Sequence, residues 1–392
     1  MTRKRPILLA ALITLALGLP ATAFETRATS AFVLDQTSGT VLFAKNADIP
    51  LPPASMSKLM TLFMAFEAIR SGRLALDERL PVSEHAMSFG GSTMFLNTRD
   101  KVRVEDLLRG IIVLSGNDAC VVLAETLSPD GTEAGFARLM TQRAQQLGMT
   151  NSIFANASGW PAPGHVMSMR DLALLAQRLI ADFPEFYPMF AEREFAFDNR
   201  APTNRLNRNP LLGAVPGADG LKTGHTEEAG FGLVGSAAQG ERRVVFVISG
   251  LPTAQARAQD SAAIVNWAFR QFGERKLLSS GTRIATAPVW MGNVTEVGLV
   301  PAGDVTALMS VNAPAGAQAG EVVFDGPVAA PIAKGQAIAR LVVPRDGLPD
   351  LVVPLVAETD VPAAGYLRRV AAVGWLLVSR LRGDTATTAA AS

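Results

Sequence analysis

The sequence predicts a protein of the α/β (α+β) class: a domain with a mixed helical region and an antiparallel sheet, then a small all-β domain and a C-terminal amphipathic helix. Three observations lead to this prediction. Apolar residues change from a strand period to a helical period near residue 55 and return to the strand period near residue 220. After residue 276 no helical period is found until about residue 361. The length of 392 residues, 48% of them hydrophobic, is sufficient for two cores.

The first 23 residues have the pattern of a secretory signal peptide. A basic start at Arg3–Arg5 is followed by the apolar run Ile7–Leu19 and by Pro20-Ala-Thr-Ala23, which ends in a small-residue cleavage pattern. An uncleaved membrane anchor is the alternative, but the apolar run is shorter than the ~20 residues that a spanning helix needs. We therefore expect cleavage after Ala23 and export from the cytoplasm.

The charge and the cysteine and histidine content exclude several classes of function. Removing residues 1–23 takes away three basic residues and no acidic one, which leaves 33 Lys+Arg against 35 Asp+Glu, so nucleic acid is not an expected partner. Cys120 is the only cysteine, so no intrachain disulfide can form. His85, His165 and His225 lie far apart in the sequence without a metal-binding motif, and we predict no metal and no cofactor.

The chain from residue 24 to residue 275 is predicted to form the first domain. Two β-rich runs, 31–35 and 40–44, flank a turn with a glycine and predict a hairpin. Apolar residues three and four apart predict a helix over 55–69, with Ser55 at its start after Pro52-Pro53. Further helices are expected at 104–113, 119–127, 134–147, 168–180 and 256–272, and strands at 220–224, 230–236 and 242–248. Strands from both ends of this domain are expected to share one sheet.

Residues 276–360 are rich in Val, Ala, Pro and Gly in short runs and predict the small β domain. Residues 361–384 then form an amphipathic pattern with arginines on one face and Trp375 at the boundary, while 385–392 predict a disordered tail. Arg369 and Arg380 bracket only ten uncharged residues, too few to span hydrocarbon. This favours a helix that lies in the membrane interface, although an ordinary packed amphipathic helix has the same pattern.

Three short motifs carry the predicted chemistry. Ser55-Met-Ser-Lys58 at a helix start places a hydroxyl and an amine on one face, so that Lys58 could serve as the base that a serine nucleophile needs. Ser115-Gly-Asn117 offers a second hydroxyl and an amide; the same spacing at Ser310-Val-Asn312 is assigned to structure.

The third motif, Lys222-Thr-Gly224, lies on a predicted strand. It offers a cation and a hydroxyl for a substrate carboxylate, with a glycine that allows a close approach of the backbone. S-x-x-K, S-x-N and K-T-G in this order form the set found in penicillin-binding proteins and class A β-lactamases.

The segments around these motifs make the resemblance closer. Pro53-Ala-Ser-Met-Ser-Lys-Leu-Met-Thr61, Leu114-Ser-Gly-Asn-Asp-Ala-Cys120 and Asp219-Gly-Leu-Lys-Thr-Gly-His-Thr226 resemble the low-molecular-mass D-alanyl-D-alanine carboxypeptidases, as does the chain from about 28 to 275. The resemblance implies a β-lactamase/transpeptidase-like fold. It also implies removal of the terminal D-alanine from peptidoglycan stem peptides by an exported protein on the outer face of the inner membrane, with β-lactam antibiotics as covalent inhibitors.

The resemblance also implies a role for each site residue. Ser55 would form the acyl-enzyme, Lys58 would take its proton, Ser115 would relay it to the departing D-alanine, and Asn117 would orient the peptide. Lys222 and Thr223, with Gly224 beside them, would bind the terminal carboxylate. His225 would contribute its backbone N–H, together with that of Ser55, to an oxyanion hole. Arg208 is a further candidate near the carboxylate, with a surface salt bridge as the equal alternative.

Three other functions stay open at this point. A D,D-endopeptidase that cuts cross-links would use the same residues. A class A-like β-lactamase is less favoured, because the sequence lacks the E-x-x-L-N loop that carries the additional glutamate of those enzymes. A non-catalytic wall-binding scaffold is also less favoured, since both Ser55 and Lys58 are present.

Overall fold

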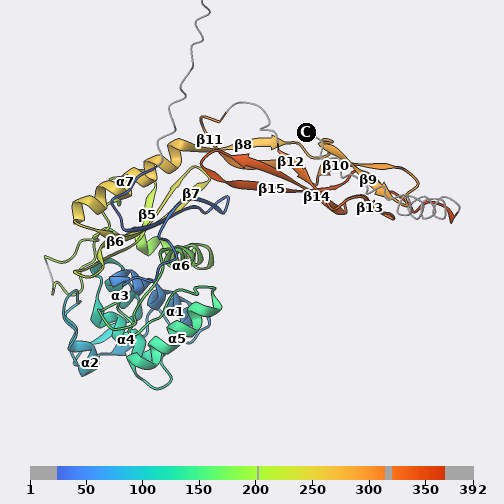
Figure 1. Ribbon diagram of the computed structural model, residues 1–392. Coiled ribbons are helices and arrows are strands. Elements are labelled where there is room, and N and C mark those ends of the chain that lie inside the picture. The colour runs from blue at the N-terminus through green and yellow to red at the C-terminus, as the bar shows by residue number, and fades with distance from the viewer. Residues whose placement is uncertain (1–23, 201–202, 314–319, 367–392) are drawn as a thin grey trace, which may run out of the picture.

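The computed structural model describes residues 24–200, 203–313 and 320–366. A five-stranded antiparallel sheet forms the centre of the first domain, with the strand order β2-β1-β7-β6-β5 (Figure 1). Its strands are β1 (Ser30–Asp35), β2 (Thr40–Lys45), β5 (Ala218–Thr226), β6 (Gly230–Gln239) and β7 (Arg242–Leu251). The predicted hairpin and the sharing of one sheet by the two ends of the domain are therefore confirmed.

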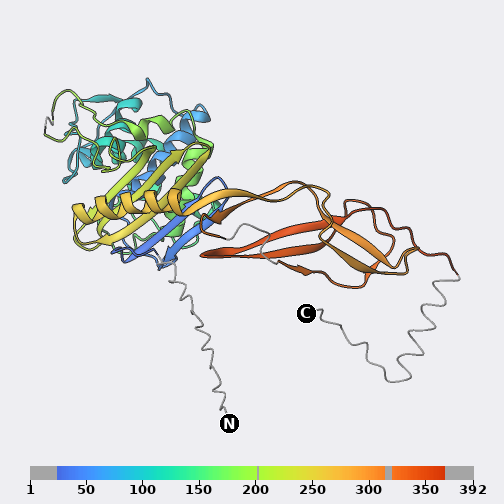
Figure 2. The ribbon, with the colours of Figure 1, turned by 90° about the horizontal axis from the view of Figure 1, so that it is seen from above.

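Side chains that alternate along the strands give the sheet two buried faces. Val245 and Val247 of β7 pack into the core of the helical region, while Val244, Phe246 and Ile248 pack beneath helix α7. Figure 2 shows α7 across one face of the sheet and the helical region behind the other. The helices are α1 (Lys58–Arg70), α2 (Glu84–Met87), α3 (Val104–Arg109), α4 (Asn117–Leu127), α5 (Glu133–Gln146), α6 (Met169–Asp182) and α7 (Ala254–Gln271).

Two predicted helices differ from the structure near the motifs. Ala54–Ser57 form a 3-10 turn before α1, so Ser55 precedes the regular helix. The helix expected over 104–113 ends at Arg109, and a wider π turn continues from Gly110 to Leu114. Such turns alter the direction in which the next residue leaves a helix. Ser115, which follows the π turn, has a left-handed φ of 64°. A short hairpin of β3 (Arg79–Pro81) and β4 (Lys101–Arg103) completes this region.

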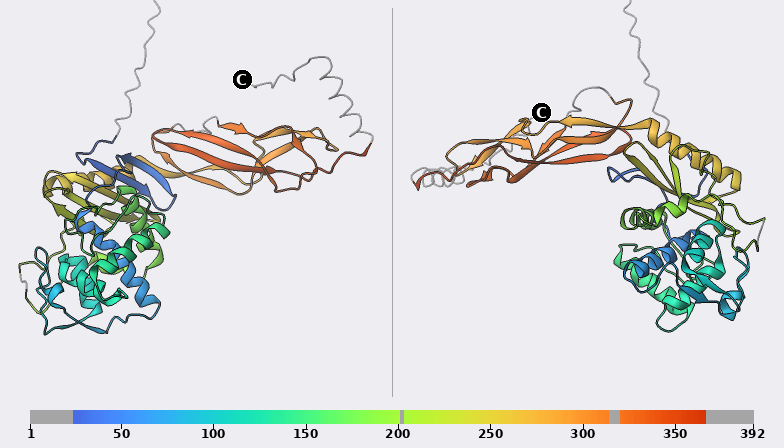
Figure 3. Two further views of the ribbon diagram at one scale, coloured as in Figure 1. Left: turned by 60° about the horizontal axis from the view of Figure 1, so that its bottom comes forward. Right: turned by 180° about the vertical axis from the view of Figure 1, so that it is seen from behind.

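Within residues 272–313 and 320–365, the regular elements of the second domain are all strands. A six-stranded sheet has the order β12-β14-β15-β10-β9-β13, and a two-stranded sheet joins β8 to β11. The strands are β8 (Phe272–Leu278), β9 (Ala285–Trp290), β10 (Glu296–Pro301), β11 (Val305–Ser310), β12 (Glu321–Val323), β13 (Val328–Ala329), β14 (Ala337–Arg345) and β15 (Leu348–Ala357). This domain projects away from the helical region, to which it is joined on the sheet side (Figure 3).

The junction between the domains is formed by α7 and β8, which are continuous in sequence. Phe272 and Leu308 pack in the same core as α7, and the guanidinium of Arg242 donates to the carbonyl of Phe272 over 2.6 Å. The predicted signal peptide (1–23), the tail (385–392) and nearly all of the predicted anchor helix (361–384) lie outside the described residues. Within the described parts of the chain, no helix is both long and apolar enough to cross a bilayer.

Candidate active site

The start of α1 positions the first two site residues. Ser55 lies in the 3-10 turn and is half-buried, whereas Lys58, three residues later, is completely buried. The turn is held against two glycines. A Cβ at Gly224 of β5 would lie only 3.0 Å from the carbonyl oxygen of Pro53, and a Cβ at Gly159 would overlap the backbone of Ala54. The nucleophile turn therefore sits between β5 and the loop that contains Gly159.

The amine of Lys58 has three oxygen atoms around it. Its Nζ lies 2.8 Å from Ser55 Oγ, 2.7 Å from Asn117 Oδ1 and 2.6 Å from the carbonyl oxygen of Ser158. A neutral amine can donate its two hydrogens to the two carbonyl oxygens and turn its lone pair toward the Ser55 hydroxyl. Burial favours this neutral form and lowers the pKa of Lys58 to about 8.

The turn between the π turn and α4 brings in the second motif. The left-handed conformation of Ser115 directs its hydroxyl to Lys222, whose Nζ donates to Ser115 Oγ over 3.0 Å. Asn117 accepts from Lys58 with its oxygen and donates with its amide nitrogen to the carbonyl of Gly90 over 2.9 Å. These two contacts allow only one orientation of the Asn117 amide. Asp118 accepts from the backbone N–H groups of the loop before β4, which fixes that loop beside the site.

Strand β5 supplies the third motif. Lys222 and Thr223 are buried, and burial together with the nearby cations lowers the pKa of Lys222 well below its usual value. The side chain of His225 is exposed and stacks on Phe231 at 3.8 Å between ring centroids, so it points away from the motif cluster. Because β5 is the edge strand of the sheet, its outer backbone groups can pair with an extended peptide.

Comparison with known proteins identifies this arrangement. The family model of D-alanyl-D-alanine carboxypeptidases matches residues 19–253, and the model of the penicillin-binding protein 5 C-terminal domain matches residues 272–363. The D-alanyl-D-alanine carboxypeptidase DacC of Escherichia coli is 36% identical over 350 residues, which cover 86% of this chain and 85% of that protein. The chain belongs to the D-alanyl-D-alanine carboxypeptidase family.

Solved structures agree with this assignment. Penicillin-binding protein 5 from Haemophilus influenzae has a TM-score of 0.71 at 33% identity and matches 87% of this carboxypeptidase and 99% of its own chain. Penicillin-binding protein D2 from Listeria monocytogenes, in an ampicillin-bound form, has a TM-score of 0.57 at 33% identity, covering 63% of this chain and 99% of that one. The protein is thus a serine-type D-Ala-D-Ala carboxypeptidase with a mixed α/β transpeptidase-like domain and a β-rich C-terminal domain.

Positive charge accumulates beside Lys222 in this carboxypeptidase. Arg208 donates to Ser92 Oγ over 2.8 Å and to the carbonyl of Leu114 over 3.1 Å, and its guanidinium contacts no carboxylate among the described residues. Between the residues that the structure describes, Arg208 therefore forms no surface salt bridge, which was the alternative for it. Arg257 of α7 donates to the carbonyl of Arg208 over 3.4 Å, while its Nε is buried without a hydrogen-bond partner. Lys222 and Arg257 are buried and Arg208 is exposed beside them, so this group of cations favours a bound anion.

Three members of the carboxypeptidase site were missed by sequence reasoning. The carbonyl of Ser158 carries no side-chain signal, so only the fold can show it. Arg257 has one signal, because a basic residue in the first turn of a helix opposes the helix dipole. His165 accepts the N–H of Ala155 and lies 2.8 Å from Ser57 Oγ; burial lowers its pKa to about 4 and keeps it neutral. It links the Gly159 loop to the nucleophile turn.

Three further residues, Asp171, Cys120 and Ser310, have structural roles. Asp171 accepts from the N–H of Asn151 and the hydroxyl of Ser152, which closes the loop before α6. Burial raises the pKa of the Cys120 thiol to about 12, so it remains a neutral apolar side chain. Ser310 lies at the end of β11, where it accepts a hydrogen bond from Gln271. The S-x-N spacing at residue 310 is therefore remote from the motif cluster.

Proposed function

We propose that Ser55 is the nucleophile of this carboxypeptidase and that Lys58 is its base. The Ser55 oxygen attacks the carbonyl carbon of the penultimate D-alanine while Lys58 accepts the hydroxyl proton. The backbone N–H groups of Ser55 and His225 stabilise the oxyanion. When the tetrahedral intermediate collapses, the peptide C–N bond breaks and the Ser115 hydroxyl donates a proton to the departing amine. Ser115 then regains a proton from the Lys58 ammonium group. The net result is the transfer of one proton from Ser55 to free D-alanine.

Deacylation uses the same groups in reverse. A water molecule loses a proton to Lys58 as it attacks the ester carbonyl, and the C–O bond to Ser55 breaks as Ser55 regains a proton. Lys222, Thr223, Arg208 and Arg257 bind the terminal carboxylate and thereby select a free C-terminus, while Asn117 orients the peptide backbone. The observation that carries this proposal is the set of three oxygen atoms around the buried Lys58 amine.

The test measures D-alanine release from a stem peptide that ends in D-Ala-D-Ala, by mass spectrometry. The full mature chain is compared with Ser55→Ala and with Ser38→Ala, a control whose hydroxyl hydrogen-bonds to Asp35 in the β1–β2 turn. We expect release by the parent and by the Ser38→Ala protein only. Equal release by Ser55→Ala would refute the proposed nucleophile. No release by any of the three would refute carboxypeptidase action on this peptide.

β-lactam antibiotics are proposed to acylate the same serine. Their strained amide offers a carbonyl to Ser55 and a carboxylate to Lys222 and Thr223, and the D2 protein of Listeria monocytogenes supports the proposal through its ampicillin-bound form. Intact-mass analysis after incubation with penicillin should show one added penicillin in the parent and none in Ser55→Ala. An unmodified parent chain would contradict this proposal.

The protein is also proposed to be exported and attached to the outer face of the inner membrane. The signal pattern of residues 1–23 and the basic amphipathic pattern of residues 361–384 support this location. Removing residues 367–392 should move the protein from the membrane pellet to the soluble fraction without loss of peptide cleavage. Exchanging Arg369 and Arg380 for glutamate in the full chain should weaken pelleting as well. Continued pelleting of the truncated chain would contradict the anchor.

A further inference from the structure

Glu133 is a largely buried carboxylate that lies outside the three motifs. It is the first residue of α5, and its side chain is 10% exposed. Helix α5 does not need it as a cap, because the Thr132 hydroxyl accepts the N–H of Gly135. Glu133 Oε1 instead accepts the backbone N–H of Ala157 over 3.0 Å, and its Oε2 lies 3.2 Å from His85 Nε2. The carboxylate therefore holds a loop rather than its own helix.

Ala157 and the next residue, Ser158, form the part of the loop that Glu133 contacts, and both are completely buried. The Thr61 hydroxyl of α1 donates to the carbonyl of Ala157 over 2.6 Å, so Ala157 is held from α1 and from α5 at once. The carbonyl of Ser158 then accepts from Lys58 Nζ over 2.6 Å. The carboxylate of Glu133 is thus connected to the amine of Lys58 through two hydrogen bonds and two consecutive residues.

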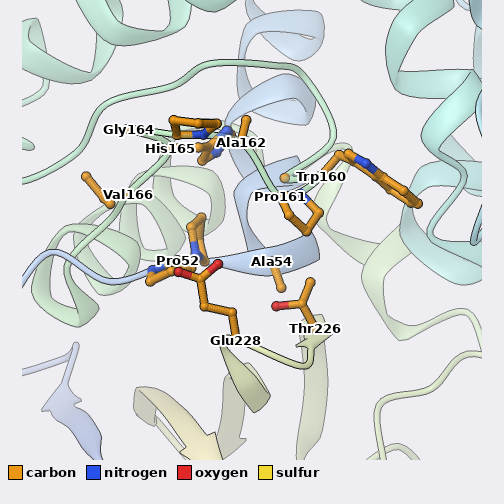
Figure 4. Close-up of a pocket in the computed structure, with 13 residues that line it drawn as sticks. Pro52, Ala54, Trp160, Pro161, Ala162, Gly164, His165, Val166, Thr226 and Glu228 are labelled. Carbon is orange, nitrogen blue, oxygen red and sulfur yellow. The ribbon is translucent and has the colours of Figure 1, made fainter.

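The remainder of the loop is fixed by contacts of its own. Figure 4 shows Pro161 beside Ala54 of the nucleophile turn, and His165 further along the same loop. The ring of His165 lies 2.8 Å from a serine hydroxyl of that turn. The backbone of Ala157 is held separately, by α1 and α5. Of these two anchors of the Ala157 backbone, Glu133 is the one that carries a charge.

The charge of Glu133 also acts on Lys58. Because the two groups are hydrogen-bonded to consecutive residues, they lie within about 12 Å of each other. Burial lowers the pKa of Lys58 and the charge of Arg208 lowers it further, whereas the charges of Asp118 and Glu133 raise it. The other titratable groups that face this amine are Cys120, His165 and Lys222. The two carboxylates thus oppose the cations that destabilise the Lys58 ammonium.

We propose that Glu133 is a positioning residue for the base, Lys58. It holds the Ser158 carbonyl against the Lys58 amine, and it stabilises the ammonium group that forms when Lys58 takes the Ser55 proton. A buried amine beside other cations gains a proton at a cost, which a fixed carboxylate offsets in part. Glu133 acts through Lys58 rather than on the substrate, and no proton passes to it. This role of Glu133 rests on the proposed function, in which Lys58 is the base.

The first test titrates Lys58 directly. The full mature chain is labelled with carbon-13 at the lysine Cε atoms, and the NMR signal of Lys58 is identified by its absence in Lys58→Met. Glu133→Gln keeps an oxygen that accepts the Ala157 N–H but removes the charge. The midpoint of the Lys58 titration should therefore move to lower pH by about 0.5–1 pH unit, as expected for one charge at roughly this distance.

Glu125→Gln is the matched control for the titration. This partly buried carboxylate of α4 accepts from the Ser83 hydroxyl and not from the loop. Its replacement should leave the Lys58 midpoint where it is in the parent. An unchanged midpoint in Glu133→Gln, or an equal change in Glu125→Gln, would overturn the proposal.

The second test separates the hydrogen bond from the charge. Glu133→Ala removes both, so the Ser158 carbonyl is no longer held against Lys58. The rate of Ser55 acylation by a penicillin above about pH 9 should fall about ten-fold or more in Glu133→Ala, because a displaced catalytic group slows the reaction strongly. In Glu133→Gln this rate should stay within about three-fold of the parent rate. Equal rates in the two variants would overturn the positioning role.

Failure of the proposed function would give a different result. If the acylation rate of the parent does not follow the titration of Lys58, then Lys58 is not the base and the proposed mechanism fails. The NMR comparison of Glu133→Gln with the parent does not depend on activity. It therefore still decides whether Glu133 controls the charge of Lys58.

Discussion

The two domains of this carboxypeptidase bury different kinds of side chain. In the peptidase domain Lys58, Asp118 and Lys222 are at most 3% exposed. In the described part of the β domain, the core around Leu299 and Leu355 is apolar, and Ser310 is its single buried polar residue. A buried charge without an opposite partner opposes folding. The contrast shows that the described β domain buries no charged side chain, whereas the peptidase domain retains unfavourable charge where its chemistry requires it.

The electrostatics of the peptidase cleft show how that charge is used. The pKa of Lys222 is lowered by burial first and then by the nearby Lys58, Arg208 and Arg257. The pKa of Arg257 is lowered to about 10, first by burial and then by the charge of Arg208. A bound carboxylate would stabilise the charged forms of both Lys222 and Arg257. Substrate affinity therefore depends on the repulsion among these cations. No comparable group of cations is found in the described β domain.

The largest expected effect comes from removing the buried amine. Lys58→Met should lower kcat/KM for D-Ala release by at least about 10³-fold, because Ser55 loses its base. The melting temperature should stay the same or rise, since an apolar side chain replaces a buried charge. The control is Lys334→Met, at an exposed lysine of the β domain, which should change neither quantity. A fully active Lys58→Met protein would remove the basis of the comparison.

Removal of Arg257 should have the next largest effect. Arg257→Met should raise KM for a D-Ala-D-Ala peptide by about 10- to 100-fold, as expected for the loss of a buried charged contact to a carboxylate. Arg257→Lys should restore part of the affinity, because the charge returns without the planar geometry. Arg345→Met is the control in the β domain, where a half-buried arginine donates to backbone carbonyls. An unchanged KM in Arg257→Met would show that Arg257 serves only the packing of α7.

A smaller effect is expected from pH. Because the pKa of Lys58 is about 8, the amine is protonated below that pH and cannot accept the Ser55 proton. The rate of Ser55 acylation by a β-lactam should therefore rise about ten-fold per pH unit below pH 8 and level off above it. Stopped-flow rates between pH 6 and 9.5 measure this rise. If the residual activity of Lys58→Met rises with pH in the same way, a group other than Lys58 causes the pH dependence.

The smallest effect on activity is expected from the β-domain core. Leu355 is completely buried, so Leu355→Ala should lower the free energy of unfolding of that domain by about 2–5 kcal/mol. Calorimetry should register the loss, while kcat/KM for a soluble peptide stays within two-fold of the parent. A larger loss of activity would mean that the β domain supports the cleft as well as its own fold.

Sequence patterns were most informative where the structure depends on neighbours in the chain. The hairpin of β1 and β2 and the helices α5 and α6 lie within two residues of their predicted limits, because periodicity and turn residues act locally. The π turn at Gly110–Leu114 was missed. A helical period cannot distinguish it from one more turn of α3, since the apolar residues on both are buried. Boundaries next to the site were therefore the least predictable.

In the candidate site too, residues within the motifs could be predicted, whereas residues brought in by the fold could not. Ser55 and Lys58 face each other because of a three-residue spacing, and the three motifs could be identified from their order alone. Ser158 and Arg257 could not, since the carbonyl of Ser158 has no residue-type signal and Arg257 lies in a helix after all three motifs.

The sequence by itself determined the family, the two domains and the residue types of the catalytic chemistry, because these depend on motifs and on local periodicity. Only the tertiary structure decided which oxygen atoms surround Lys58 and which cations gather near Lys222. Lys58 is 59 residues from Asn117 and 100 from Ser158 in the chain, and Lys222 is 107 from Ser115. Their proximity results from the packing of helices and sheet, which buries these groups together and shifts their pKa values.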